Sequence, residues 1–110
     1  MSSTSKIESV PNFIKGEWIK VKTDTTAKVY NPSTGEVIAE TPMCGAAEVD
    51  QAVLACEAAA LNWAETPPVE RARVLFRYKM LLEDHFEEVA ACVTREHGKT
   101  LPEARGDVRR

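Results

Sequence analysis

The spacing of apolar residues changes at Gly45, and this change constrains the fold more than any other feature of the chain. Before Gly45, short apolar runs alternate with turn residues, which is typical of β-strands. After Gly45, apolar residues recur every three or four positions, which predicts amphipathic helices. All predicted strands therefore precede all predicted helices. A βαβ crossover would need a further strand after the helices, and none is predicted.

Two strand–turn–strand units are expected in the first part. Residues 13–21 predict a hairpin with Lys15 and Gly16 at its turn. Residues 28–30 and 36–40 predict two further strands around the turn sequence Asn-Pro-Ser-Thr-Gly, since proline fixes φ while asparagine and glycine accept turn geometry. Residues 1–11 are polar and end at a proline, so we expect a mobile leader there.

The first two predicted helices each carry one apolar face. The first face consists of Val49, Val53, Cys56, Ala60 and Trp63. Thr66-Pro67-Pro68 then separates the helices, with Thr66 as the expected N-cap and Pro67 as the first helical residue. The second face consists of Ala72, Leu75, Tyr78 and Leu82.

The last two predicted helices are defined by their caps. Asp84 followed by Glu87 resembles a capping box and predicts a third helix, which ends at Gly98. Its apolar residues Phe86, Val89 and Val93 are expected to be buried. Thr100 and Glu103 form a second capping box, which opens a fourth helix running to Arg110. No predicted sheet is large enough to cover the apolar faces, so we expect a truncated α/β protein.

Composition excludes several classes of protein. The chain has 14 basic and 17 acidic residues, a net charge of −3, and no basic face or tail suited to nucleic acid. Its apolar runs are far shorter than the ~20 residues that a membrane span requires. The N-terminus has no secretory signal pattern. Three cysteines without a Cys-x-x-Cys pair predict a reducing, cytoplasmic location.

Residue chemistry alone gives no complete catalytic set. Gly98-Lys99-Thr100 resembles the end of a P-loop, but Val93 occupies the position of the required first glycine, which favours a pair of helix caps. His85 and His97 lack metal-ligand spacing. Cys44 precedes a helix but has no histidine nearby in sequence to act as its base. Cys56 and Cys92 are interpreted as small core residues.

Several sequence runs nevertheless form a specific series of landmarks. They are residues 12–18 (NFIKGEW), 30–37 (YNPSTGEV), 52–63, 71–76 (RARVLF) and 96–100 (EHGKT). Over residues 12–110 the chain resembles the start of the aldehyde dehydrogenase superfamily. The closing pattern Gly-Lys-Thr-Leu-x-Glu-Ala-x-Gly-Asp-Val-x-Arg is most similar to the CoA-acylating methylmalonate/malonate-semialdehyde dehydrogenases.

This resemblance implies a large α/β subunit with a Rossmann-like NAD domain, a catalytic domain and an oligomerisation arm. Residues 12–110 would form the opening strands and the helices at the edge of the NAD domain. The full-length protein would be a homo-oligomer that oxidises a semialdehyde with NAD through a cysteine thioester, which CoA then releases. The family's catalytic residues are expected beyond Arg110, so the isolated chain is predicted to be inactive and to bind no cofactor.

The resemblance also implies roles for three positions. Arg110, in the Gly-Asp-Val-x-Arg pattern, would hold the carboxylate of the substrate. The alternative is a simple ion pair with Asp107, which lies on the same helical face. The backbone carbonyl of Val29 and the side chain of Glu96 would bind a monovalent cation. A helix-end carboxylate without an ion is the alternative for Glu96.

Two other functions remain open. The chain could belong to another NAD(P)-dependent aldehyde dehydrogenase with a different substrate. It could also be a non-catalytic structural or assembly module in its own right.

Overall fold

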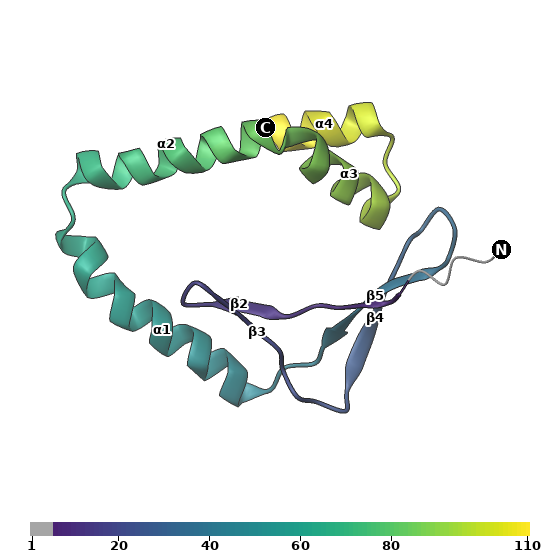
Figure 1. Ribbon diagram of the computed structural model, residues 1–110, viewed down its shortest axis with the longest axis horizontal. Coiled ribbons are helices and arrows are strands. Elements are labelled where there is room, and N and C mark those ends of the chain that lie inside the picture. The colour runs from purple at the N-terminus through teal and green to yellow at the C-terminus, as the bar shows by residue number, and fades with distance from the viewer. Residues whose placement is uncertain (1–5) are drawn as a thin grey trace. The chain divides into compact units, whose positions relative to one another are not determined.

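The computed structural model describes residues 6–110, which divide into two compact units. Residues 6–30 and 36–62 form one, called the strand unit here, which contains every described strand and most of the first helix (Figure 1). Residues 31–35 and 63–110 form the other, called the helical unit. The predicted order of strands followed by helices is confirmed.

The predicted hairpin is present in the strand unit. Strands β2 (Asn12–Ile14) and β3 (Glu17–Ile19) pair antiparallel. Their turn has positive φ at both central residues, 54° at Lys15 and 76° at Gly16, which matches the twist of the flanking strands. Phe13 and Trp18 face each other across the pair with ring centroids 4.7 Å apart.

A three-stranded sheet completes the strand unit and corrects the end of the predicted leader. Strand β5 (Val37–Pro42) pairs antiparallel with β4 (Thr26–Tyr30) and parallel with β1 (Glu8–Ser9). The amide of Val10 donates to the carbonyl of Glu40 at 2.9 Å, so pairing begins before residue 11. The free edge of β5 supplies the partners that these backbone groups need. Residues 1–5 lie outside the described part of the chain.

All four predicted helices are present, with small shifts at their starts. Their bounds are α1 (Ala46–Glu65), α2 (Pro68–Asp84), α3 (Phe86–His97) and α4 (Leu101–Arg109). Pro67, not Thr66, is the N-cap of α2, and Pro68 is its first residue. His85, not Asp84, is the N-cap of α3, because Asp84 still belongs to the last turn of α2. None of the helices over residues 6–110 is long and apolar enough to cross a bilayer.

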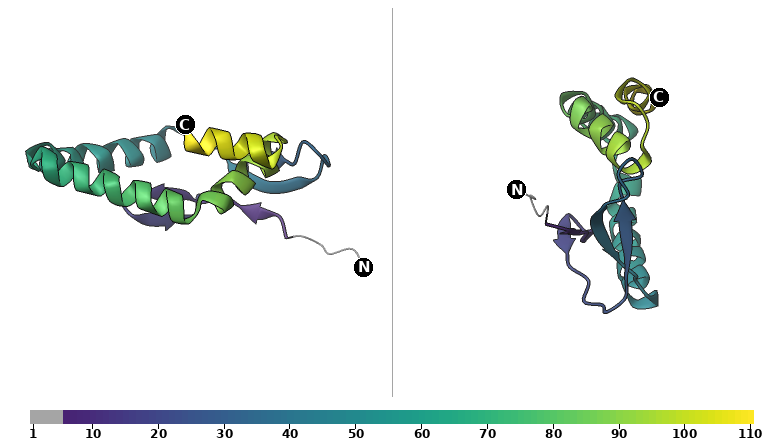
Figure 2. Two further views of the ribbon diagram at one scale, coloured as in Figure 1. Left: turned by 90° about the horizontal axis from the view of Figure 1, so that it is seen from above. Right: turned by 90° about the vertical axis from the view of Figure 1, so that its right-hand side faces the viewer.

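Burial among the described residues is concentrated where α3 packs against α4. Ala90 of α3 and Ala104 of α4 are fully buried, and the two helices lie side by side in Figures 1 and 2. Alanine at these positions permits close approach of the two backbones. The side chains expected to be buried in α3 (Phe86, Val89 and Val93) are half-buried.

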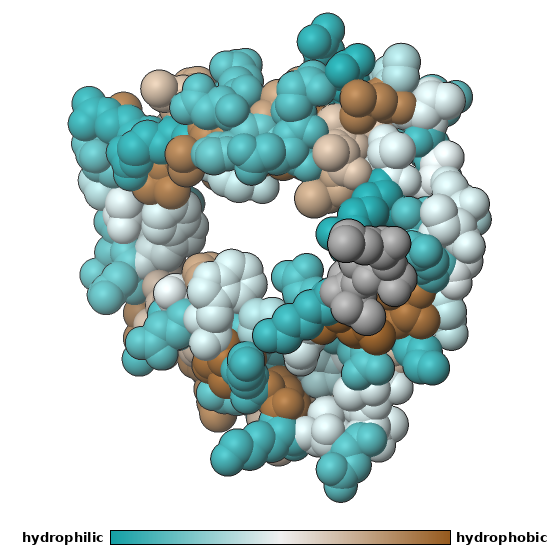
Figure 3. Space-filling view, turned by 45° about the vertical axis from the view of Figure 1, so that its right-hand side comes forward, coloured by the Kyte–Doolittle hydropathy of each residue, from teal (hydrophilic) through white to brown (hydrophobic). Residues whose placement is uncertain are grey.

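The apolar faces of α1 and α2 are largely exposed. Val49 and Val53 of α1 are 56% and 57% exposed, and Leu75 of α2 is 63% exposed. Figure 3 shows such apolar side chains (brown) between polar ones (teal) at the surface. The interpretation of Cys56 and Cys92 as core residues is wrong, because each lies on a helix face that the described residues leave uncovered.

Candidate functional site

The candidate site is built on the short connection between α3 and α4. Gly98 ends α3 in the left-handed conformation, with φ of 84°, which confirms the predicted C-cap. A Cβ at this position would lie 3.0 Å from Cγ of Pro32, in the turn between β4 and β5. Glycine is therefore required both for its φ and for the space, and the packed turn fixes the backbone from which Lys99 projects.

The start of α4 is fixed by the predicted capping box. The amide of Glu103 donates to Oγ1 of Thr100 at 3.5 Å, and the amide of Thr100 donates to Oε2 of Glu103 at 3.2 Å. These reciprocal bonds satisfy backbone donors that the first helical turn leaves unpaired. Lys99 thus lies between a helix end and a helix start that are each held by a defined cap.

Lys99, Asp107 and Arg110 form an ion-pair network, called the charge trio here. Nζ of Lys99 donates to Oδ2 of Asp107, and Nη2 of Arg110 donates to Oδ1 of the same carboxylate at 2.6 Å. Hydrogen bonds from Lys99 and then from Arg110 hold the pKa of Asp107 below its usual value. Asp107 is therefore ionised at neutral pH.

The charge trio lines an open hollow of about 540 Å³. Its lining residues are His97, Lys99, Glu103, Gly106, Asp107 and Arg110. Gly106 lies within α4, where glycine is less favourable than alanine by about 1 kcal/mol. A Cβ at Gly106 would contact nothing within 4 Å, so its absence enlarges the hollow beside Arg110 without relieving any clash.

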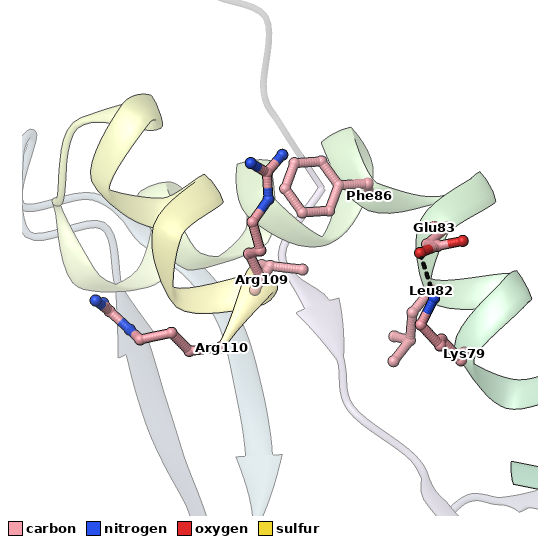
Figure 4. Close-up of a pocket in the computed structure, with 7 residues that line it drawn as sticks. Lys79, Leu82, Glu83, Phe86, Arg109 and Arg110 are labelled. Carbon is pink, nitrogen blue, oxygen red and sulfur yellow. Dashed lines mark hydrogen bonds and ion pairs between the residues drawn. The ribbon is translucent and has the colours of Figure 1, made fainter. Parts of the chain in front are cut away.

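A second hollow of about 510 Å³ also borders Arg110. It is lined by Lys79, Leu82, Glu83, Phe86, Val108, Arg109 and Arg110 (Figure 4). The guanidinium of Arg109 lies 5.6 Å from the centre of the Phe86 ring, and the side chain of Arg110 points away from that ring. The two adjacent arginines therefore have different surroundings, one stacked on an aromatic ring and the other beside a carboxylate.

A second ion pair fixes α4 to α3. Nε and Nη2 of Arg105 donate to the two carboxylate oxygens of Glu87 at 2.9 and 3.0 Å. The hydrogen bonds from Arg105 lower the pKa of Glu87. Together with the buried alanines, this pair sets the orientation of the helix that carries Asp107 and Arg110.

Two interpretations of Arg110 follow from the sequence, a substrate-binding role and, as the alternative, a simple ion pair with Asp107. The ion pair given as the alternative is present, while 77% of the Arg110 side chain remains exposed. The role of Arg110 in holding a substrate carboxylate stays a prediction. Sequence reasoning missed the contact of Lys99 with Asp107, because the two residues are eight positions apart and the contact spans a helix cap.

The predicted cation site at Val29 and Glu96 stays a prediction. Val29 is half-buried in β4 of the strand unit, and Glu96 is exposed in the last turn of α3 in the helical unit. Across residues 6–110, no three histidine, cysteine, aspartate or glutamate side chains gather closely enough to hold a metal ion.

Comparison with known proteins identifies the family. The sequence profile of the aldehyde dehydrogenase family matches residues 18–110. This chain belongs to the aldehyde dehydrogenase family. Among its relatives, the malonate-semialdehyde dehydrogenase of Bacillus pumilus is 44% identical over 104 residues, which cover 94% of this chain and 21% of the relative. That of Listeria monocytogenes serotype 4a is 45% identical over 104 residues, with the same coverage of each protein.

Solved structures confirm the fold. A protein described as a methylmalonate-semialdehyde dehydrogenase from Sinorhizobium meliloti, complexed with NAD, matches with a TM-score of 0.92 and 36% identity over 97% of this chain and 22% of its own. The methylmalonate-semialdehyde dehydrogenase of Oceanimonas doudoroffii matches with a TM-score of 0.89 and 34% identity over 94% and 21%. The chain spans about a fifth of the length of the relatives that it matches. The predicted α/β start of an aldehyde dehydrogenase subunit is confirmed.

Proposed function

We propose that this chain supplies the N-terminal part of an NAD-dependent, CoA-acylating malonate- or methylmalonate-semialdehyde dehydrogenase. The observation that carries the proposal is the placement of Arg110, which is exposed beside a hollow and follows the glycine that widens it. The names of several relatives, which are malonate- or methylmalonate-semialdehyde dehydrogenases, support the same substrate class. The NAD in the Sinorhizobium meliloti relative supports the cofactor.

The chemistry of the substrate explains why an arginine is suitable. A malonate-type semialdehyde has a carboxylate at the end opposite its aldehyde, so the enzyme must hold an anion while the aldehyde reacts. A guanidinium can donate two parallel hydrogen bonds to a carboxylate, whereas an ammonium offers only a point charge. Nη2 of Arg110 donates to Asp107, and 77% of the Arg110 side chain is exposed, so further N–H groups remain accessible to a ligand. Arg110 would therefore orient the substrate.

We infer that the complete subunit, and not residues 6–110 alone, would bind the dinucleotide. Glycines with positive φ stand singly at three separate turns, at residues 16, 35 and 98, so residues 6–110 provide no glycine-rich cradle for a pyrophosphate. NAD, when bound to the complete subunit, would accept the hydride, and the family's nucleophilic cysteine would lie outside this chain. The role proposed for residues 6–110 is to bind and orient the substrate.

A hybrid subunit tests the proposal. In it, this chain replaces the matching fifth of the Bacillus pumilus malonate-semialdehyde dehydrogenase. We expect NADH formation from malonate semialdehyde in the presence of CoA, whereas the 110-residue chain alone forms none. Arg110→Leu should lower kcat/KM for malonate semialdehyde about 30- to 1000-fold, because a charge-assisted bidentate contact is lost and a carboxylate is left unpaired.

Matched controls decide how the result is interpreted. Activity on propanal, which has no carboxylate, should change less than threefold, and Arg110→Lys should recover only part of the lost kcat/KM. Equal losses on both aldehydes would contradict the proposed substrate class and favour a different aldehyde dehydrogenase. If the covalent hybrid does not fold, co-expression of this chain with the remaining four-fifths of the Bacillus enzyme gives the same measurement.

A further inference from the structure

We propose that Lys99 and Asp107 are positioning residues for Arg110, with Asp107 orienting the guanidinium and Lys99 compensating the charge of Asp107. This inference rests on the proposed role of Arg110 and concerns residues that would not themselves touch the substrate. Under this inference, recognition of a substrate carboxylate depends on all three residues of the charge trio and not on Arg110 alone.

The geometry of the Asp107 carboxylate provides the first support. Its two oxygens are used separately, Oδ2 by Lys99 and Oδ1 by Arg110. A carboxylate held at one oxygen can still rotate, but one held at both oxygens from different directions cannot. Lys99 therefore restrains the oxygen to which Arg110 binds, even though Lys99 and Arg110 are eleven residues apart and attached to different ends of α4.

The balance of charge provides the second support. The charge trio contains two positive groups and one negative group, so Lys99 offsets the charge of Asp107. The carboxylate of Glu103 also lines the hollow, but its Oε2 accepts hydrogen bonds from the amide and the hydroxyl of Thr100 in the capping box. Without Lys99, the carboxylate of Asp107 would neutralise Arg110, and a substrate carboxylate would have to compete with it. Asp107 alone would thus weaken anion binding, while Asp107 paired with Lys99 orients Arg110 without cancelling its charge.

The surroundings of Lys99 provide the third support. Its backbone is held between the left-handed Gly98, against which Pro32 packs, and the N-cap Thr100. About one-third of the side chain is exposed for both Lys99 and Asp107, compared with 77% for Arg110. The Lys99–Asp107 contact is thus partly buried, whereas Arg110 is exposed to solvent and accessible to a ligand.

The first test uses the full 110-residue chain and the malonate dianion as the probe. Binding is followed by the NMR shift of the Arg110 Nε–H group, with uncharged malonamide as the control ligand. Lys99→Met should weaken malonate binding about fivefold, Lys99→Arg should leave it within twofold, and no variant should alter the response to malonamide. Lys28→Met, which removes the same charge from β4, is the matched control and should have no effect on malonate binding.

The second test uses the hybrid subunit. Lys99→Met should raise KM for malonate semialdehyde about fivefold with little change in kcat, and should leave propanal oxidation unchanged. A purely structural role for Lys99 would instead lower activity on both aldehydes together. Equal malonate affinity in Lys99→Met and the parent chain, or equal losses on both aldehydes, would overturn the inference.

The two proposals can fail separately. If Arg110→Leu selectively impairs oxidation of malonate semialdehyde while Lys99→Met does not, the proposed function stands and the positioning role is wrong. If Arg110→Leu has no selective effect, the proposed function is wrong. The malonate titration of the 110-residue chain then still decides whether Lys99 controls anion binding at Arg110.

Discussion

The α3–α4 pair and the two longer helices α1 and α2 have the same spacing of apolar residues but differ in how far their side chains are buried. The α3–α4 pair contains both fully buried side chains of the described residues, an αL cap, a capping box and a bidentate ion pair. By contrast, α1 and α2 bury no residue completely, and apolar side chains such as Leu54 and Phe76 are more than 60% exposed. Amphipathic spacing alone therefore forms a helix without determining what covers it.

The difference lies in contacts made between elements. Ala90 and Ala104 have small side chains, and each is buried because a second helix lies against it. The same residue type is exposed along α1, for example at Ala58. Burial in this chain thus follows from the connection at Gly98, which is short enough to bring α4 back onto α3.

The largest expected change in stability comes from placing a larger side chain in the α3–α4 contact. Ala90→Leu should destabilise the pair by about 2–3 kcal/mol, because the added atoms have no space between the two helices. Ala58→Leu, the matched change in exposed α1, should alter stability by less than about 0.5 kcal/mol. Amide hydrogen exchange of α4 measures the first effect, and equal protection in the two variants would contradict the contrast.

Smaller changes in stability are expected when either of the two glycines beside the charge trio, Gly98 or Gly106, is replaced by alanine. Gly98→Ala should cost about 1–2 kcal/mol, since alanine is disfavoured at φ of 84° and its Cβ would lie 3.0 Å from Pro32. Gly106→Ala should instead stabilise α4 by up to about 1 kcal/mol, because its Cβ meets open space. Thermal unfolding followed by circular dichroism distinguishes the two, and a Gly98→Ala variant as stable as the parent would disprove the required cap.

The smallest expected effect is a loss of stability of the α3–α4 pair at low pH. The pKa values of Glu87 and Asp107 are lowered in the folded state, so the folded protein binds fewer protons than the unfolded chain as pH falls. Their stabilisation should be complete at neutral pH. It should be lost as the pH falls below the usual pKa of each group, about 4.5 for Glu87 and about 3.8 for Asp107, and through the lowered pKa values of the folded state. Amide protection in α4 between pH 6 and pH 3 measures this loss.

Two variants control the acid prediction. Replacing Glu87 by glutamine and Asp107 by asparagine together should flatten the pH dependence, because neither group then titrates. Glu70→Gln, which breaks the exposed pair with Arg73 on α2, should leave the dependence in α4 unchanged. A parental pH dependence that survives the double substitution would show that other groups cause it.

Local signals in the sequence determined much of the chain's structure. The turn at Lys15 and Gly16, the αL cap at Gly98 and the capping box at Thr100 each depend on residues within a few positions of one another. Their backbone conformations follow from steric limits and local hydrogen bonds, so they could be predicted without tertiary contacts. The same holds for the ion pair of Asp107 with Arg110, three residues apart on one helix.

The contacts between distant strands and between helices could be read only from the tertiary structure. Three contacts join residues that are distant in sequence. β1 pairs with β5 across three intervening strands, Arg105 binds Glu87 across most of α3, and Lys99 binds Asp107 across the cap of α4. Apolar spacing could not distinguish the half-buried face of α3 from the exposed faces of α1 and α2, because all three have the same period. Periodicity is a property of one helix, whereas burial and charge pairing depend on which second element lies against it.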